Sequence, residues 1–206
     1  MKGLTAIVLA IAEWGRRLAR RWGWSRGGAT REGGQDWTGR FLSQVLAQYH
    51  FTSEASDWLR REITVRVDDP HSTRGGGYWI PEERRVRLLT AQHEAAVHEL
   101  AHAWWHDRRR GQERALMEAV TRAAHEPDPR YQQVRRLAEG YVYGTAHDGW
   151  PGLLVDSNDW EMFAGLASGT MGDLRLMPAY LRAFYRGLFQ EPEETPDGSD
   201  RPVLPS

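Results

Sequence analysis

Cysteine is absent from the 206 residues of this chain. Its absence excludes disulfides, thiolate metal ligands and a cysteine nucleophile. An excess of charge is also lacking, because 27 basic and 28 acidic side chains leave a formal net charge of -1. A chain so near neutrality has no bulk attraction for phosphate backbones, so we expect no nucleic-acid partner.

No apolar run near the N-terminus is long enough to cross a bilayer, since Leu4–Ala12 is too short for that. Apolar residues from Leu4 to Trp22 follow helical spacing, with arginines mostly on the other side. Residues 1–34 are therefore interpreted as a basic amphipathic helix followed by a linker rich in glycine and charge. Such a helix could dock on the protein, touch a membrane surface peripherally or act as a signal anchor. The compartment is left open, with the cytoplasm slightly favoured over a membrane-associated or secreted location.

The strongest signal in the sequence is the HExxH pattern formed by His98, Glu99 and His102. The surrounding run, residues 91–110, is rich in alanine and leucine and is predicted to be a helix, with Thr90 as its N-cap. On a helix the two imidazoles lie one turn apart and can converge on one metal ion. Glu99 then lies beside the ion, where it can act as a general base.

The other patterns predict an α+β fold with one main domain, residues 35–190. We expect a small, twisted, mostly antiparallel sheet packed on the HExxH helix, followed by a helical lobe that carries the third metal ligand. The acidic, proline-rich residues 191–206 are predicted to be a disordered tail. The expected helices are 36–49, 53–59, 112–125, 130–142 and 177–189, together with one that contains residues 160–166 and ends near Gly169 or Gly172. The expected strands are 63–67, 78–80 and 86–89.

A catalytic zinc ion needs a third protein ligand besides the two histidines. The metzincin arrangement is excluded, because Trp105 and Arg108 occupy the positions of its glycine and third histidine. His106 lies a further turn along the helix and is expected at the surface or behind the ligands. Two carboxylates compete: Glu161, in the first turn of a predicted helix, and Asp148, which closes a Gly-Thr-x-x-Asp sequence typical of aspzincins. Glu161 is favoured.

Four segments together resemble the catalytic core of the gluzincins related to anthrax lethal factor. They are Gly75–Tyr78, Val86–Leu89, the HExxH run through Ala103, and Asn158–Ala164. The resemblance covers about residues 62–190 and implies a minimal zincin fold.

Within that resemblance, His98, His102 and Glu161 are implied as zinc ligands and Glu99 as the base. Tyr143, in a Tyr-Gly dipeptide, is implied to stabilise the oxyanion, with Tyr141 and His147 as rivals. The chain departs from the family at Gly165, where gluzincins often carry an acidic residue that orients a ligating histidine. Asp156, Asp159 and Asp173 are the candidates to replace it.

These patterns predict a Zn²⁺-dependent endopeptidase that acts on a peptide or protein substrate. Three alternatives are kept: a non-catalytic binding module on a zincin-like scaffold, an aspzincin-type peptidase that uses Asp148, and a membrane-binding protein whose HExxH is accidental.

Overall fold

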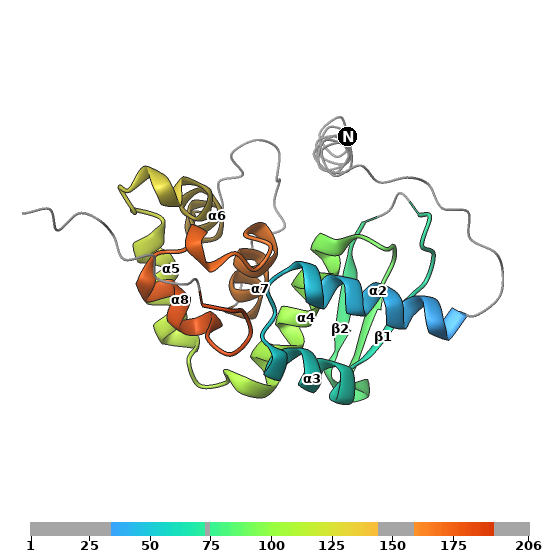
Figure 1. Cartoon of the computed structure of the whole chain (residues 1–206). Helices are drawn as coiled ribbons and strands as arrows, with labels where there is room; N and C mark the ends of the chain where they lie inside the picture. The colour runs from blue at the N-terminus through green and yellow to red at the C-terminus, as the bar shows by residue number, and fades with distance from the viewer. Residues whose placement is uncertain (1–33, 73–74, 144–158, 192–206) are drawn as a thin grey trace, which may run out of the picture.

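The computed structural model describes residues 34–72, 75–143 and 159–191. Figure 1 shows the sheet with α2, α3 and α4 at one end of the molecule and α5, α6 and α8 at the other, with α7 between the two groups. The elements in order are α2 (Gly34–Gln48), α3 (Ser53–Glu62), β1 (Thr64–Val67), β2 (Gly77–Ile80), η1 (Pro81–Glu83), β3 (Arg85–Leu88), α4 (His93–Arg108), α5 (Glu113–Ala123), η2 (Pro129–Tyr131), α6 (Gln132–Tyr143), α7 (Asp159–Gly169), η3 (Leu174–Leu176) and α8 (Ala179–Tyr185).

The predicted α+β class is confirmed, but the sheet is mixed rather than mostly antiparallel. Its strand order is β1-β3-β2, with β3 in the middle. β2 and β3 form the expected antiparallel hairpin, whereas β1 runs parallel to β3. The strand that returns from the hairpin inserts between β1 and β2, so β1 pairs with the second hairpin strand in the parallel sense. Val86 and Leu88 of β3 are buried.

The HExxH run is helical, as predicted, and forms α4. Thr90 is not its N-cap, because the helix begins at His93. Gln92 is the N-cap, and its side chain makes no capping hydrogen bond. The Thr90 hydroxyl instead donates to the carbonyl oxygen of Ser72 at 2.9 Å, which ties the start of α4 to the loop after β1. Gly111, two residues after the C-cap Arg109, has a φ of 89°, a conformation that favours glycine.

An aromatic cluster fixes α7 against α4. Phe163 of α7 lies between Trp105 of α4, with ring centroids 4.8 Å apart, and Tyr185 of α8, stacked at 4.4 Å. The Tyr185 hydroxyl also donates to the Phe163 carbonyl oxygen at 3.0 Å. Because all three rings are buried, their packing sets the position of the first turn of α7, which carries Glu161.

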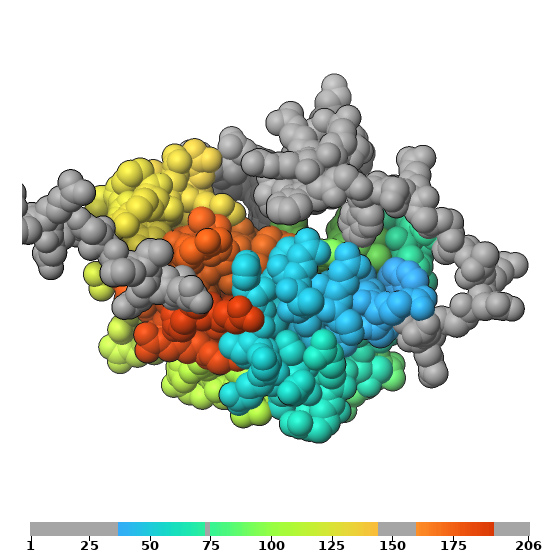
Figure 2. Space-filling model, in the orientation of Figure 1, coloured from blue at the N-terminus to red at the C-terminus, as the bar shows by residue number. Residues whose placement is uncertain are grey.

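The last helix, α8, ends at Tyr185, earlier than the predicted 189. Gly187 has a φ of 85° and turns the chain back, so that Phe189 forms an isolated β-bridge with Phe51. Thr52 donates its backbone N–H to the carbonyl oxygen of Leu188 at 3.0 Å. Figure 2 shows the chain after α2 (cyan) lying against this C-terminal segment (red). These contacts join the sheet end of the molecule to the helical end.

The predicted N-terminal helix and linker (1–34) and the predicted tail (191–206) lie outside the described residues, apart from Gly34 and Glu191 at their borders. Among the helices that the structure describes, none combines the length and the hydropathy needed to cross a membrane.

Candidate metal centre

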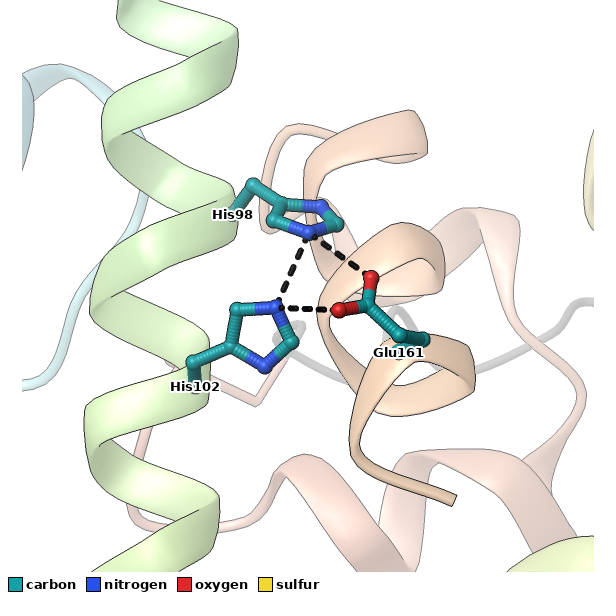
Figure 3. Close-up of side chains that lie close together, drawn as sticks. All are labelled: His98, His102 and Glu161. Atoms are coloured by element: carbon teal, nitrogen blue, oxygen red, sulfur yellow. Dashed lines mark hydrogen bonds and ion pairs between the residues drawn. The ribbon is translucent and has the colours of Figure 1, made fainter. Parts of the chain in front are cut away.

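Helix α4 places His98 and His102 one turn apart on one face. Their Nε2 atoms approach to 3.0 Å, and Figure 3 shows both nitrogens turned toward a common point. The His102 side chain is only 6% exposed, and the Trp160 ring packs on its edge with centroids 5.6 Å apart. The pattern-based prediction that this helix supplies two converging imidazoles agrees with this geometry.

Helix α7 brings Glu161 to the same point. Its Oε2 lies 3.3 Å from Nε2 of His98, and its Oε1 lies 3.4 Å from Nε2 of His102. Figure 3 shows the carboxylate facing both rings across the gap between the helices. The three predicted ligands, which are 63 positions apart in the chain at their extremes, therefore come together.

The separations of the donor atoms fit a tetrahedral zinc ion. Bonds of about 2.0–2.1 Å at the tetrahedral angle place neighbouring donors about 3.3–3.4 Å apart. The contacts measure 3.0–3.4 Å, with the two histidines facing different oxygens of the Glu161 carboxylate. With one donor atom taken from each residue, the three atoms lie within 4.8 Å of one another. Hydrogen bonds from His102 and then His98 hold the pKa of Glu161 well below its usual range, so the carboxylate is ionised, as a metal ligand must be. Two imidazoles and one carboxylate are a donor set that zinc accepts in catalytic sites.

Glu99 follows His98 on α4, is buried, and is close enough to all three residues of the cluster to interact with them electrostatically. Burial raises its pKa, while the nearby charges of His98 and His102 and a hydrogen bond from the Trp79 backbone N–H oppose that rise. Strand β2 passes very close, because a Cβ added to Gly77 would lie 2.7 Å from Cγ of Glu99. Gly77 is thus required for the close approach of β2 to Glu99, a role that the sequence did not reveal.

Tyr143, the predicted oxyanion residue, is directed elsewhere. Its hydroxyl forms a 2.7 Å hydrogen bond with Nε2 of His125, just after the end of α5, and the residue is 52% exposed. Tyr141, two residues earlier on α6, faces nearly the opposite way and packs its hydroxyl against Gly165 of α7. Burial, and then the negative charge of Glu161, raise the pKa of Tyr141, so its hydroxyl keeps its proton at neutral pH. Of the two tyrosines, the structure brings Tyr141 to the Glu161 helix.

The predicted supporting residues have mixed outcomes. His106 contacts Asp107 at 3.0 Å and the Trp79 ring, consistent with its expected place beyond the ligands. Asp173 instead caps η3 and pairs with Arg175, so it does not orient a ligating histidine. Residues 144–158, with His147, Asp148 and Asp156, lie outside the described residues, as does the side chain of Asp159.

Sequence reasoning missed Ser168. This buried residue of α7 places its Oγ 3.4 Å from Nδ1 of His98. No motif marks it, although its position seven residues after Glu161 puts it two helical turns further along the same face.

Comparisons with known proteins give no family for the chain. No protein-family model matches it, and neither the curated proteins nor the solved structures contain a significant match.

Proposed function

We propose that this protein is a zinc-dependent endopeptidase of the gluzincin type. The observation that supports this most directly is the convergence of His98, His102 and Glu161, with Glu99 beside them. Three protein ligands leave one zinc coordination position open, which is the arrangement of catalytic rather than structural zinc sites. The resemblance to lethal factor-like gluzincins supports the same assignment of ligands.

Zinc, when bound, would lower the pKa of a water molecule and polarise the substrate carbonyl. Glu99 would take the proton of that water and pass it to the departing amine. Its buried position suits this role, because burial raises the pKa of Glu99 toward neutral pH. A group whose pKa lies near the working pH both accepts and returns a proton efficiently.

Tyr141 replaces Tyr143 as the proposed oxyanion donor. A donor must reach the cluster and carry its proton, and Tyr141 lies against the Glu161 helix with a raised pKa. A hydroxyl placed there can donate a hydrogen bond to the charge that develops on the carbonyl oxygen.

The edge strand β2 supports a peptide as the substrate. Leu89 donates its N–H to the Gly76 carbonyl oxygen, so Gly76 and Leu89 are a hydrogen-bonded pair of the hairpin. Hydrogen-bonded and non-hydrogen-bonded pairs alternate along an antiparallel hairpin, so the backbone N–H and C=O groups of Gly77 and Trp79 point away from β3. The backbone N–H of Trp79 donates a hydrogen bond to the Glu99 carboxylate. An extended peptide laid along this edge would gain backbone hydrogen bonds next to the ligand cluster.

Glu99→Gln tests the proposal. The variant should bind zinc as the wild type does, because Glu99 is not a ligand, and should lose about 10²–10⁴-fold in turnover, the contribution of a general base. Zinc content by elemental analysis and cleavage of a peptide library give the two measurements. Undiminished peptidase activity in this variant would contradict the mechanism.

A non-catalytic zincin-like module is the second candidate. One observation favours it: within the described residues, no carboxylate hydrogen bonds to Nδ1 of either histidine, because His98 contacts Ser168 and His102 has no partner at this atom. Carboxylate partners raise the basicity of ligating histidines in many zinc sites. A zinc-loaded wild type that cleaves nothing in a diverse peptide library would favour the module over the enzyme.

A further inference from the structure

Ser168 is the side chain that contacts the outer nitrogen of a predicted ligand. Its Oγ lies 3.4 Å from Nδ1 of His98, and Nε2 of the same ring faces Glu161 and His102. The serine is only 6% exposed, so water competes little for this contact.

The hydroxyl hydrogen of Ser168 has a different partner. Oγ donates to the carbonyl oxygen of Gly165, one turn earlier on α7, at 3.2 Å. A hydroxyl has only one hydrogen, so toward His98 the Oγ atom can only accept. When Nε2 of His98 binds a metal ion, the proton of its ring lies on Nδ1, where the Ser168 oxygen can accept it.

We propose that Ser168 is a positioning residue that fixes His98 in its metal-binding tautomer, a neutral hydroxyl in the role that an acidic side chain often has. The inference rests on the proposed zinc site. The position where an acidic residue is expected, Gly165, has no space for one, because a Cβ there would overlap the Tyr141 hydroxyl. The support therefore comes from one turn further along the helix.

The two histidines are supported unequally. Nδ1 of His102 is buried and has no hydrogen-bond partner among the described residues, and its ring is held by Trp160 instead. Within the described part of the chain, the Ser168 hydroxyl at His98 is thus the hydrogen bond that reaches an outer nitrogen of the two histidines. A neutral acceptor adds less basicity to a ligand than a carboxylate does. We therefore expect loss of the Ser168 hydroxyl to weaken zinc binding measurably, but less than loss of a carboxylate partner would.

Ser168→Ala tests this dependence through zinc affinity, measured by competition with a chromogenic chelator. We expect the dissociation constant to rise about 10-fold, the lower end of the effect of losing an outer hydrogen-bond partner. Thr170→Val is the matched control, because it also removes a buried hydroxyl, one that donates to the Leu166 carbonyl oxygen at the end of α7. Its zinc affinity should equal that of the wild type. Ser168→Thr keeps a hydroxyl and should restore the affinity.

The Nδ1 proton of His98 provides a second measurement. In the zinc-loaded wild type, nitrogen-15 NMR should show a slowly exchanging proton on Nδ1 of His98, and Ser168→Ala should speed the exchange of that proton with solvent. A rapidly exchanging Nδ1 proton in the zinc-loaded wild type, or equal zinc affinities of the wild type and Ser168→Ala, would overturn the role of Ser168. A wild type that binds no zinc would instead contradict the metal site itself, so the two failures are distinct.

Discussion

Helices α4 and α7 face each other across the candidate metal centre and contribute to it in different ways. α4 carries both imidazoles and Glu99 within five consecutive residues, and His102 and Glu99 are buried. α7 carries Glu161, 42% exposed near its N-terminal end, and Ser168 two turns later. One helix holds a dense local motif, and the other holds two separated residues that only its packing directs to the site.

This difference shows which part of the site is set by local sequence and which by tertiary packing. On α4 the helix geometry alone places His98 and His102 together. On α7 the position of Glu161 depends on Phe163, which is fixed between Trp105 and Tyr185. The ligand set is therefore complete only when the sheet end and the helical end of the molecule pack together.

The largest expected effect is loss of zinc binding when a proposed ligand is removed from either helix. His102→Ala and Glu161→Ala should each weaken zinc binding by more than the about 10–100-fold that loss of an outer partner costs, because a direct bond is lost. His106→Ala, one turn beyond His102 on the same face, should leave the affinity unchanged. Isothermal titration with zinc measures all three. Equal affinities of the wild type and Glu161→Ala would show that α7 supplies no ligand.

Substitutions of Tyr141 and Tyr143, which lie on nearly opposite sides of α6, test which of the two tyrosines is the oxyanion donor. Tyr141→Phe should lower kcat by about 10²–10³-fold if its hydroxyl is the donor, with zinc affinity preserved. Tyr143→Phe removes only the hydrogen bond to His125 after α5, so kcat should stay at the wild-type value. Steady-state kinetics on one peptide substrate compare the pair. The reverse ranking would return the role to Tyr143.

Packing of α7 against α6 is expected to give a smaller effect, on stability. Gly165→Ala should lower the free energy of unfolding by about 1–3 kcal/mol, because its methyl group would overlap the Tyr141 hydroxyl. Gly39→Ala in α2 is the control: nothing lies within 4 Å of its Cβ position, so the better helix propensity of alanine should stabilise by about 0.5–1 kcal/mol. Urea unfolding measures both. A Gly165→Ala variant as stable as the Gly39→Ala variant would contradict the close contact.

The sequence predicted the parts of the molecule that depend on short-range periodicity. The α4 helix and the β2–β3 hairpin follow from residue spacing, and so does the convergence of His98 and His102. The parallel pairing of β1 with β3 could not be predicted, because strand order depends on how separate segments pack and not on the alternation within each strand.

The errors at the site have a similar cause. Tyr141 and Tyr143 both lie on α6, and only the packing of that helix decides which one faces α7. Ser168 belongs to no motif. A serine inside a helix can hydrogen bond to a carbonyl oxygen of the preceding turn, so its residue type alone does not predict a role at the site. Asp173 was weighed as a partner of a ligating histidine because it is acidic and close in sequence, but it satisfies the backbone of η3 instead.

Asp173 gives the smallest expected effect and separates a role in folding from a role at the metal. Its carboxylate accepts hydrogen bonds from the Arg175 backbone and guanidinium, at 3.0 and 2.7 Å, and the guanidinium foremost lowers its pKa. Asp173→Ala should therefore cost about 1 kcal/mol of stability at neutral pH, typical of a lost cap, with unchanged zinc affinity.

The pH dependence of that cost has a definite sign. The folded-state pKa of Asp173 lies below its unfolded value of about 3.9, so its stabilisation is fully present above about pH 4–5 and is lost as the pH falls through the folded-state pKa. The stability difference between the wild type and Asp173→Ala should thus shrink on acidification below pH 4, as followed by urea unfolding at several pH values. A weaker zinc affinity in this variant, absent from the matched Asp128→Ala variant at the cap of η2, would instead place Asp173 behind the metal ligands.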